Sequence, residues 1–339
     1  MSKKLILAIE SSCDDSSIAI IDKESLKCIF EKKISQEKEH FEFGGVVPEL
    51  AARLHTATLP KILKECKPYF NELVAIAVTA EPGLSVSLLG GITMAKTLAG
   101  ILNLPLIAVN HLVGHFYSLF LDKKAELDIG LLLVSGGHTL VLFINEKGEI
   151  KTLAQSLDDS FGESFDKVAK MMDLGYPGGA VLENLALRAS EKKLQFSVPL
   201  LHSKECDFSF SGLKNQVRVK ILELLKENKL DEKAKQEIAY AFEEAATSHI
   251  LNKLEKLFKN FHFKKFAVVG GASANLKLRS RIEKLCDGFK CELLLAPLSH
   301  CADNALMIAR ASVESFKNNN FVSINDDILS VKSKNLNHI

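Results

Sequence analysis

The hydrophobic pattern of the first hundred residues alternates between strand-like and helix-like periods. Short apolar runs bounded by polar turns predict three strands, at residues 5–9, 17–22 and 27–34. Helical apolar spacing predicts helices at 47–66 and 85–102, and buried apolar runs predict strands at 73–78 and 104–109. The chain is therefore expected to open with a hairpin and to continue as an α/β unit.

The second half of the chain begins with the same pattern. Apolar strands are expected at 130–134, 139–144 and 150–155, the first two joined by a tight turn. Further elements are expected as helices at about 165–174, 179–190, 213–227 and 231–258, a strand at 266–269, a helix at 303–316 and then a polar tail. Two halves that both begin with a hairpin predict one duplicated architecture.

Composition places limits on what this architecture does. The 339 residues are 47% hydrophobic and 25% charged, which is typical of a globular chain long enough for two domains. The net charge of +1 excludes a bulk polycation, so any nucleic-acid contact needs a local basic face or a partner. Residues 188–235 carry 11 basic and 7 acidic side chains, which fits a phosphate-tracking face or an ordinary solvated helix surface.

The cysteines and the amino terminus indicate a cytoplasmic protein. The seven cysteines include no Cys-x-x-Cys pair, which disfavours a disulfide framework or a zinc ribbon. No apolar run is expected to span a membrane. The basic and then apolar start is interrupted by Glu10, Asp14 and Asp15, so it predicts a core strand rather than a signal peptide.

The segment Asn110-His111-Leu112-Val113-Gly114-His115 is the strongest chemical signal. If His111 opens a helix, the spacing places His111 and His115 on one face, near enough to share a metal ion. The alternative is an ordinary helix start, and a third ligand would decide between the two. A metalloprotease helix would need glutamate where Leu112 stands, and Gly114 weakens such a helix by roughly 1 kcal/mol.

Three glycine- or serine-rich turns are candidates for binding phosphate or adenosine. Residues 10–17 and 135–139 occupy equivalent turns of the two halves, where small residues let backbone N–H groups approach phosphate oxygens. Residues 268–275 lead from a buried strand through two glycines into a helix start, which favours an anionic or polar ligand. The alternative is that all three are plain turns, with Asn275 as a helix N-cap.

A series of motifs in fixed order resembles one known family. The motifs are Ile9-Glu10-Ser11-Ser12-Cys13-Asp14-Asp15, Asn110 to His115, Val134-Ser135-Gly136-Gly137-His138-Thr139, Phe165-Asp166-Lys167, Gly175-Tyr176-Pro177-Gly178-Gly179, Phe208-Ser209-Phe210-Ser211-Gly212-Leu213-Lys214, Gly270-Gly271-Ala272-Ser273-Ala274-Asn275 and Cys301-Ala302-Asp303-Asn304. They cover about residues 5–311 and resemble the tRNA N6-adenosine threonylcarbamoyltransferase family, TsaD, earlier described as O-sialoglycoprotein endopeptidase.

The resemblance implies an α/β fold of the actin-like, sugar-kinase-like ASKHA type, with duplicated ribonuclease-H-like subdomains and a central nucleotide cleft. The expected division is residues 1–110 as the first lobe with the metal helix at its end, and 111–316 as the second. A helical insertion is expected at about 160–260 of the second lobe, and residues 317–339 are expected to form a polar C-terminal tail that is loosely packed.

The implied reaction transfers a threonylcarbamoyl group from threonylcarbamoyl-AMP to N6 of the adenine 3′ to the anticodon, in tRNAs that read codons beginning with A. By resemblance, His111, His115 and Asp303 hold one divalent metal ion, Fe²⁺ first and zinc as the alternative. Two imidazoles and one carboxylate suit either metal and leave positions open for a substrate oxygen. The implied partners are a TsaB-like paralogue and a TsaE-like ATPase.

The substrate contacts are also implied residue by residue. Val134, Ser135, Gly136, Gly137 and His138 match the phosphate-side loop of the family. The family's positions near the ribose, the base and the adenosine of the donor correspond to Asp166, Gly179, Glu183 and Asn275 in this sequence. Carboxylates are natural acceptors for ribose hydroxyls, although an acidic residue such as Glu183 also favours a nearby helix start.

The chain departs from the family pattern at Val113, where many relatives have glutamate. No side chain is therefore assigned as a general base, and positioning and leaving-group stabilisation are expected to carry the rate. Two alternatives to the transferase are an ATPase or small-molecule kinase of the same fold and, with Leu112 against it, a metalloendopeptidase.

Overall fold

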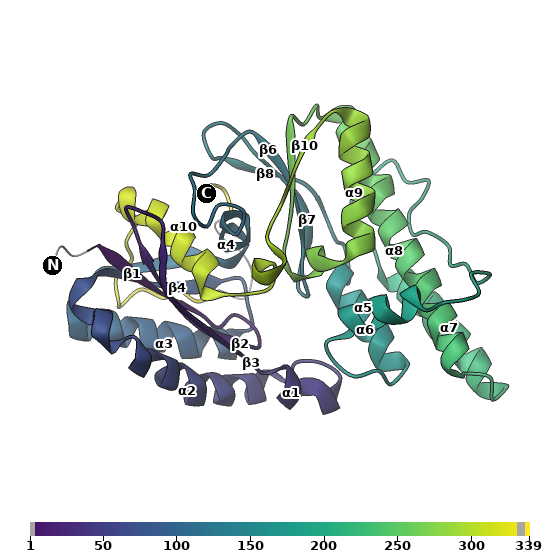
Figure 1. Cartoon of the computed structure of the whole chain (residues 1–339), viewed down its shortest axis with the longest axis horizontal. Helices are drawn as coiled ribbons and strands as arrows, with labels where there is room; N and C mark the ends of the chain where they lie inside the picture. Colours follow the sequence, from purple (N-terminus) through teal and green to yellow (C-terminus); the bar gives the residue numbers. More distant parts are fainter. Residues whose placement is uncertain (1–3, 331–335) are drawn as a thin grey trace. The chain divides into compact units, whose positions relative to one another are not determined.

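The contacts of the chain divide it into two compact units. The computed structural model describes residues 4–330 and 336–339. Unit 1 is drawn from Met1–His40, Val46–Leu127 and Ala296–Ile339, and unit 2 consists of Phe41–Gly45 and Asp128–Leu295 (Figure 1). The chain thus enters the main part of unit 2 at residue 128, not at the predicted position 111, and its last segment returns to unit 1.

Unit 1 is built on a mixed five-stranded sheet in the order β3-β2-β1-β4-β5. Its strands are β1 (Leu5–Glu10), β2 (Asp15–Asp22), β3 (Cys28–Ser35), β4 (Leu73–Glu81) and β5 (Leu106–Asn110). The β1-β2-β3 pairs are antiparallel and the β1-β4-β5 pairs are parallel. This is the predicted hairpin followed by an α/β unit.

Helices cover both faces of this sheet, which explains why every position of β1 is buried (Figure 1). The helices of unit 1 are α1 (Glu37–His40), α2 (Pro48–Glu65), α3 (Ser85–Leu102), α4 (His111–Tyr117) and α10 (Ala305–Lys317), with short 3-10 turns η2 (Lys67–Glu72) and η4 (Leu298–His300). Helices α2 and α3 pack together on one face, and α10 packs on β1 and β2. Because α4 packs on α10, β4 and β5, it belongs to unit 1.

Unit 2 repeats the same topology, with strand order β8-β7-β6-β9-β10. Its strands are β6 (Ile129–Val134), β7 (Thr139–Ile144), β8 (Ile150–Gln155), β9 (Lys265–Val269) and β10 (Glu292–Leu295). The first three pair antiparallel, and β6-β9-β10 pair parallel. Strand for strand, β6 to β10 correspond to β1 to β5, so the predicted duplication is confirmed.

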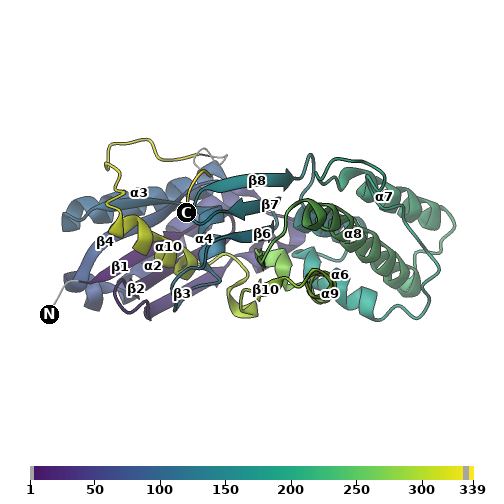
Figure 2. The same ribbon diagram turned by 90° about the horizontal axis from the view of Figure 1, so that it is seen from above.

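A group of helices beside this sheet forms the larger core of unit 2. They are α5 (Phe161–Met171), α6 (Gly178–Leu187), α7 (Ser211–Lys226), α8 (Glu232–Asn260) and α9 (Leu276–Phe289), with 3-10 turns η1 (Phe41–Phe43) and η3 (Gly271–Ala274). Figure 2 shows α7 and α9 beside α8, in agreement with their contacts. Buried aromatic side chains such as Phe165, Phe242 and Phe266 join the helices to the sheet.

Helix α9 and strand β10 are absent from the sequence prediction, which marked only a helix start near Asn275. Lysines and arginines interrupt α9, and its buried face consists of Leu278, Ile282, Leu285 and Cys286. Strand β10 has four residues, too few to show a period, and it is a strand because it pairs with β9. Pairing with β9, a long-range interaction, therefore determines strand β10, which the local pattern of residues does not show.

The predicted polar tail is not loosely packed in its described part. The backbone N–H of Val322 donates to Leu106 O at 2.9 Å, and that of Ser330 donates to Ala80 O at 3.1 Å. The side chains of Val322, Ile328 and Leu329 pack against the core of unit 1. Residues 318–330 thus cover part of the unit 1 sheet, which the polar composition of the segment did not indicate.

Helix α3 is long and apolar enough, by length and composition alone, to count as a membrane candidate, although no such run is expected from the sequence. In the structure it packs on β4 and α2 of unit 1, so its place in the core accounts in part for its apolar composition.

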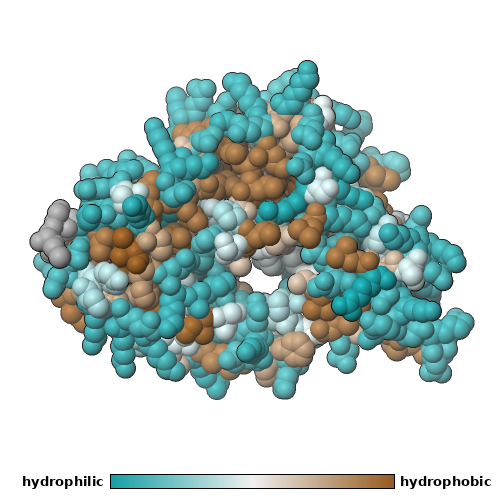
Figure 3. All heavy atoms as spheres, in the orientation of Figure 1, coloured by the Kyte–Doolittle hydropathy of each residue, from teal (hydrophilic) through white to brown (hydrophobic). Residues whose placement is uncertain are grey.

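The face of the molecule drawn in Figure 3 is largely hydrophilic, with apolar side chains gathered in patches.

Candidate active site

Helix α4 begins where the sequence predicts and presents both histidines on one face. The Asn110 side chain caps it by accepting from the N–H groups of Leu112 and Val113. His111 and His115 then lie one turn apart, with ring centroids separated by 4.7 Å and the rings nearly perpendicular. The cap therefore sets the register that brings the imidazoles together.

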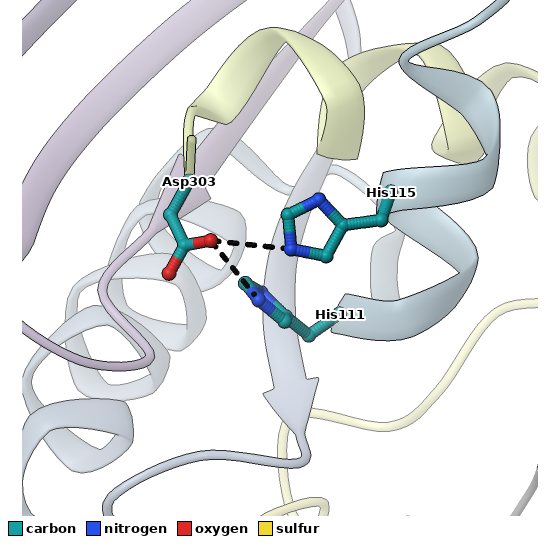
Figure 4. A group of neighbouring side chains, drawn as sticks. All are labelled: His111, His115 and Asp303. Carbon is teal, nitrogen blue, oxygen red and sulfur yellow. Dashed lines mark ion pairs between the residues drawn. The ribbon is translucent and has the colours of Figure 1, made fainter. Parts of the chain in front are cut away.

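Asp303 reaches these rings from the segment just before α10 (Figure 4). Its Oδ1 lies 3.3 Å from His111 Nε2 and 3.2 Å from His115 Nε2. Asn304 caps α10 by accepting from the Met307 N–H, which fixes the carboxylate next to it. One ligand atom from each of His111, His115 and Asp303 lies within 4.8 Å of the others.

The local chemistry of these residues fits a metal ion. The His115 side chain is fully buried, yet neither of its ring nitrogens has a hydrogen-bond partner among the described residues. A buried polar atom is normally satisfied, and the short distance from His115 Nε2 to Asp303 lacks the geometry of a hydrogen bond. Two imidazole nitrogens and one carboxylate oxygen directed at one point are the donors that Fe²⁺ or Zn²⁺ prefers.

Glu10 holds the other side of the His111 ring. Its Oε2 lies 3.2 Å from His111 Nδ1 and also accepts from the Thr79 hydroxyl, while Oε1 accepts from the Ser12 N–H at 2.6 Å. A carboxylate at Nδ1 favours the tautomer with a proton there and leaves Nε2 free for a metal. The turn after β1, a candidate phosphate loop by sequence, thus contacts the candidate metal ligand His111.

The charges of this group are strongly interdependent. Burial raises the pKa of the Asp303 carboxyl, but the neighbouring imidazoles outweigh this and hold that pKa well below its usual value. Burial lowers the pKa of His111, yet Asp303 and Glu10 raise it well above normal. The pKa of His115 is lowered, mainly by burial. The carboxylates of Glu10 and Asp303 therefore outnumber the one cationic imidazole, His111, and the negative charge that remains suits a metal cation.

Gly114 has a packing role that its sequence position did not reveal. A Cβ at this position would lie 2.7 Å from Ile308 Cδ1 and 3.3 Å from Met307 Cγ, both on α10. Ile308 is fully buried and cannot easily move aside. The glycine thus lets α4 approach α10, and this approach sets the distance between the histidines and Asp303.

The candidate phosphate loop of unit 2 is a tight turn between β6 and β7. The Ser135 hydroxyl accepts from the N–H groups of Gly137 at 3.3 Å and His138 at 3.0 Å, and the Ser135 N–H donates to His138 O. A Cβ built on Gly136 or Gly137 would meet nothing within 4 Å. The backbone of the turn is thus fixed and open to a ligand.

Two further segments hold this turn from behind. The Ser160 hydroxyl, which caps α5, donates to Gly136 O at 2.7 Å. Gly270 has a φ of +93°, and a Cβ there would lie 2.3 Å from Val134 O. The glycine turn after β9 therefore packs directly on Val134, so two of the three predicted turns lie together in unit 2.

The remaining candidate substrate residues have structural partners. Asp166 accepts from the Gly178 N–H at 2.7 Å, at the start of α6, where Gly179 is open to solvent on the side a Cβ would occupy. Glu183 accepts from the Leu276 N–H at 2.7 Å, at the start of α9. Asn275 caps α9 by accepting from the Leu278 N–H and donates to Glu243 at 2.8 Å. The alternative role of Asn275 as an N-cap is confirmed.

Sequence reasoning placed Glu10 in a candidate phosphate turn but gave it no part in the metal site, and it did not single out Ser160. Glu10 was visible as a carboxylate at the end of a buried strand, a costly position without a partner. Ser160 followed by Glu163 is the signature of a capping box, which the structure contains. Four of the 11 basic residues of 188–235 form ion pairs with nearby acids: Lys193–Glu191, Lys214–Asp159, Lys220–Glu223 and Lys229–Glu227.

Two duplicated units of this topology define the actin-like, sugar-kinase-like ASKHA class of α/β fold. The solved structure of HypF from T. kodakarensis matches 97% of this chain and 50% of its own length, with a TM-score of 0.60 and 14% identity. The activator of the 2-hydroxyisocaproyl-CoA dehydratase from Clostridium difficile matches 94% and 96% of the two chains, with a TM-score of 0.51 and 13% identity. The expected fold class is confirmed.

The chain belongs to the TsaD family, the tRNA N6-adenosine threonylcarbamoyltransferases, whose family model matches residues 27–310. The enzyme of that name from Campylobacter jejuni subsp. doylei is 65% identical over 99% of this chain and 100% of its own. That from Campylobacter concisus is 62% identical over 94% of this chain and 95% of its own. The protein is therefore a transferase that modifies N6 of adenosine in tRNA, and the kinase and peptidase alternatives gain no support.

Proposed function

We propose that His111, His115 and Asp303 hold one divalent metal ion that serves threonylcarbamoyl transfer from threonylcarbamoyl-AMP. The acceptor would be N6 of the adenine 3′ to the anticodon, in tRNAs that read codons beginning with A. The observation that carries this proposal is the convergence of three donor atoms, each within 4.8 Å of the others, around a buried imidazole that has no hydrogen-bond partner among residues 4–330 and 336–339. The donor set suits both Fe²⁺ and Zn²⁺, and Fe²⁺ is proposed first because the family resemblance implies it.

A metal ion held by these three residues would supply a Lewis acid with positions open to a substrate oxygen. Glu10 contributes by fixing the His111 ring through Nδ1, so that Nε2 keeps its direction. In the reaction itself, N6 bonds to the carbamoyl carbon while the bond from that carbon to the phosphate oxygen breaks. AMP then departs and N6 loses one proton.

In unit 2, we propose that the turn Val134 to His138 takes the phosphate of the donor. Support comes from the fixed backbone of this turn and the open space beside Gly136 and Gly137. Asp166, Gly179, Glu183 and Asn275 are proposed to line the adenosine. Since Glu183 and Asn275 already cap α9, their part would be to position that helix start as much as to touch the ligand.

No side chain of the described residues is assigned as a general base. The donor is an activated acyl-adenylate, so orientation of the amine and stabilisation of the departing phosphate would supply most of the acceleration. Val113, in place of the glutamate of many relatives, is consistent with a site that needs no acid between its histidines. A TsaB-like paralogue and a TsaE-like ATPase are proposed as partners in the cytoplasm, where the tRNA substrate is found.

The test removes each ligand in turn. His111→Ala, His115→Ala and Asp303→Asn should each lower bound metal from about one ion per chain and reduce threonylcarbamoyladenosine formation by 100-fold or more, on the order of a lost metal ligand. Metal is measured by elemental analysis and product by mass spectrometry of digested tRNA. His202→Ala, an exposed histidine of unit 2, is the matched control and should keep both.

Full transfer by a metal-free variant would overturn the metal proposal. To choose between metals, metal-free protein is reloaded anaerobically with Fe²⁺ or Zn²⁺, and the rate is compared per bound ion. A higher rate with iron is expected. Full metal content together with lost transfer would instead show that these residues act on the substrate alone.

A further inference from the structure

Two aromatic side chains stand open on a short segment that belongs to unit 2. Phe41 and Phe43 flank Glu42 in the 3-10 turn η1, and each phenylalanine is 52% exposed. Ten of the 20 phenylalanines are buried, and Phe41 and Phe43 are the most exposed of the others that stand open to solvent, at 52% against 39% for Phe289 and Phe321. Two half-open rings within three residues therefore call for a ligand or a partner.

The backbone beneath these rings is firmly held, so their exposure is not a sign of a loose loop. The Lys170 ammonium donates to Phe43 O at 2.9 Å, and the Lys170 stem lies 3.1 Å from the Cβ position of Gly44. Gly44 has a φ of +61°, which lets the chain turn sharply there. The rings are thus presented on a rigid support with a lysine beside them.

One ring also rests on the candidate donor segment. A Cβ built on Gly175 would lie 2.2 Å from Phe41 Cε2, so the ring edge packs directly on this glycine. Three residues later the Gly178 N–H donates to Asp166, and Gly179 follows. The aromatic pair therefore adjoins the turn that is proposed to hold the adenosine of the donor, within the same unit.

We propose that Phe41 and Phe43 form a stacking platform for unpaired bases of the tRNA next to the acceptor adenosine. Proteins read single-stranded RNA loops by stacking splayed bases on aromatic rings. The Lys170 charge suits a nearby phosphate, and exposed Glu42 can accept from an exocyclic base amine. The inference rests on tRNA as the acceptor and on the proposed donor contacts of Asp166 and Gly179.

The test separates stacking from simple apolar contact. Phe41→Leu and Phe43→Leu keep apolar bulk but remove the flat ring, whereas Phe41→Trp and Phe43→Trp keep a stacking surface. With full-length protein, the Kd for tRNA by fluorescence anisotropy and the KM for tRNA in transfer should rise about 5- to 100-fold in the double leucine variant. The KM for threonylcarbamoyl-AMP should stay unchanged, and the tryptophan variants should bind tRNA as the parent does.

Phe289→Leu is the matched control, since Phe289 is 39% exposed on α9 of the same unit and should not affect tRNA binding. Thermal melting of each variant checks the fold. An unchanged tRNA affinity in the double leucine variant would overturn the platform. So would a rise in KM for the donor alone, or a loss of accessory-protein binding with tRNA binding intact.

The anisotropy measurement uses neither donor nor metal. It therefore tests the platform even if the metal proposal fails.

Discussion

At the scale of single residues, the candidate metal centre depends on how each imidazole nitrogen is directed. Asn110 sets the start of the helix, Asp303 faces both Nε2 atoms, and Glu10 occupies Nδ1 of His111. His115 has no such partner on Nδ1 among the described residues. His111 is therefore the more firmly oriented ligand, and its orientation depends on a carboxylate one hundred residues away in sequence.

Glu10→Gln tests this orientation. The carboxylate accepts from the Thr79 hydroxyl, the Ser12 N–H and, in the metal-binding tautomer, His111 Nδ1–H. An amide has one acceptor oxygen and would turn an NH₂ group toward some of these donors, so metal affinity should fall about 10- to 100-fold. Competition with a chelator measures the affinity.

Glu24→Gln removes an exposed carboxylate of the same unit and should leave metal affinity unchanged. Equal affinity in the Glu10→Gln variant and the parent would mean that Glu10 does not orient the ligand.

At the scale of elements, the pairing of α4 with α10 brings together ligands that are far apart in sequence. Gly114 permits the close approach, and Arg310, fully buried on α10, donates to Phe120 O at 2.8 Å and to Lys123 O at 3.1 Å beyond the end of α4. The guanidinium also lies over the Tyr117 ring at 4.9 Å. Helix α10 is thus held against the middle of α4, against its C-terminal end and against the segment that follows it.

Gly114→Ala should be destabilising here, although alanine is normally the better helix former by roughly 1 kcal/mol. The added Cβ would meet Ile308 Cδ1 at 2.7 Å within a closed core, and such overpacking costs about 1 to 3 kcal/mol. The free energy of unfolding from denaturant titration and the metal affinity should both fall.

Adding Ile308→Val removes the opposing Cδ1 atom and should restore part of both losses. A Gly114→Ala variant as stable as the parent would show that α10 yields at this contact, contrary to the tight packing seen between the helices.

At the scale of the whole molecule, the duplication was readable because both hairpins repeat the same strand–turn–strand pattern. The course of the chain between the two units could not be read from the sequence. Residues 41–45 join unit 2, and 296–339 return to unit 1, because their contacts lie there. The boundary expected from the sequence lies at 110, whereas the packing of α4 on α10 and β5 places it at 127.

Deletion of residues 318–339 tests the role of the tail. Val322, Ile328 and Leu329 pack on the core of unit 1, so their loss should lower stability by about 2 to 4 kcal/mol. Hydrogen exchange should rise at β5, where Leu106 O accepts from the Val322 N–H. A truncated chain with the melting temperature of the parent would show that the tail is a loose extension after all.

The sequence by itself determined the hairpin-first halves, most element bounds and the family, because apolar period and motif order are local properties of the chain. It also determined that His111 and His115 share a helix face, since helical geometry fixes that spacing. The resemblance implied Asp303 as the third ligand, and the tertiary structure shows its carboxylate beside both imidazoles. Only the tertiary structure decided that Glu10 contacts His111 and that Gly114 is needed for the approach of α10. Those contacts join segments through packing and strand pairing, whose energies depend on the whole fold and leave no periodic signal in the chain.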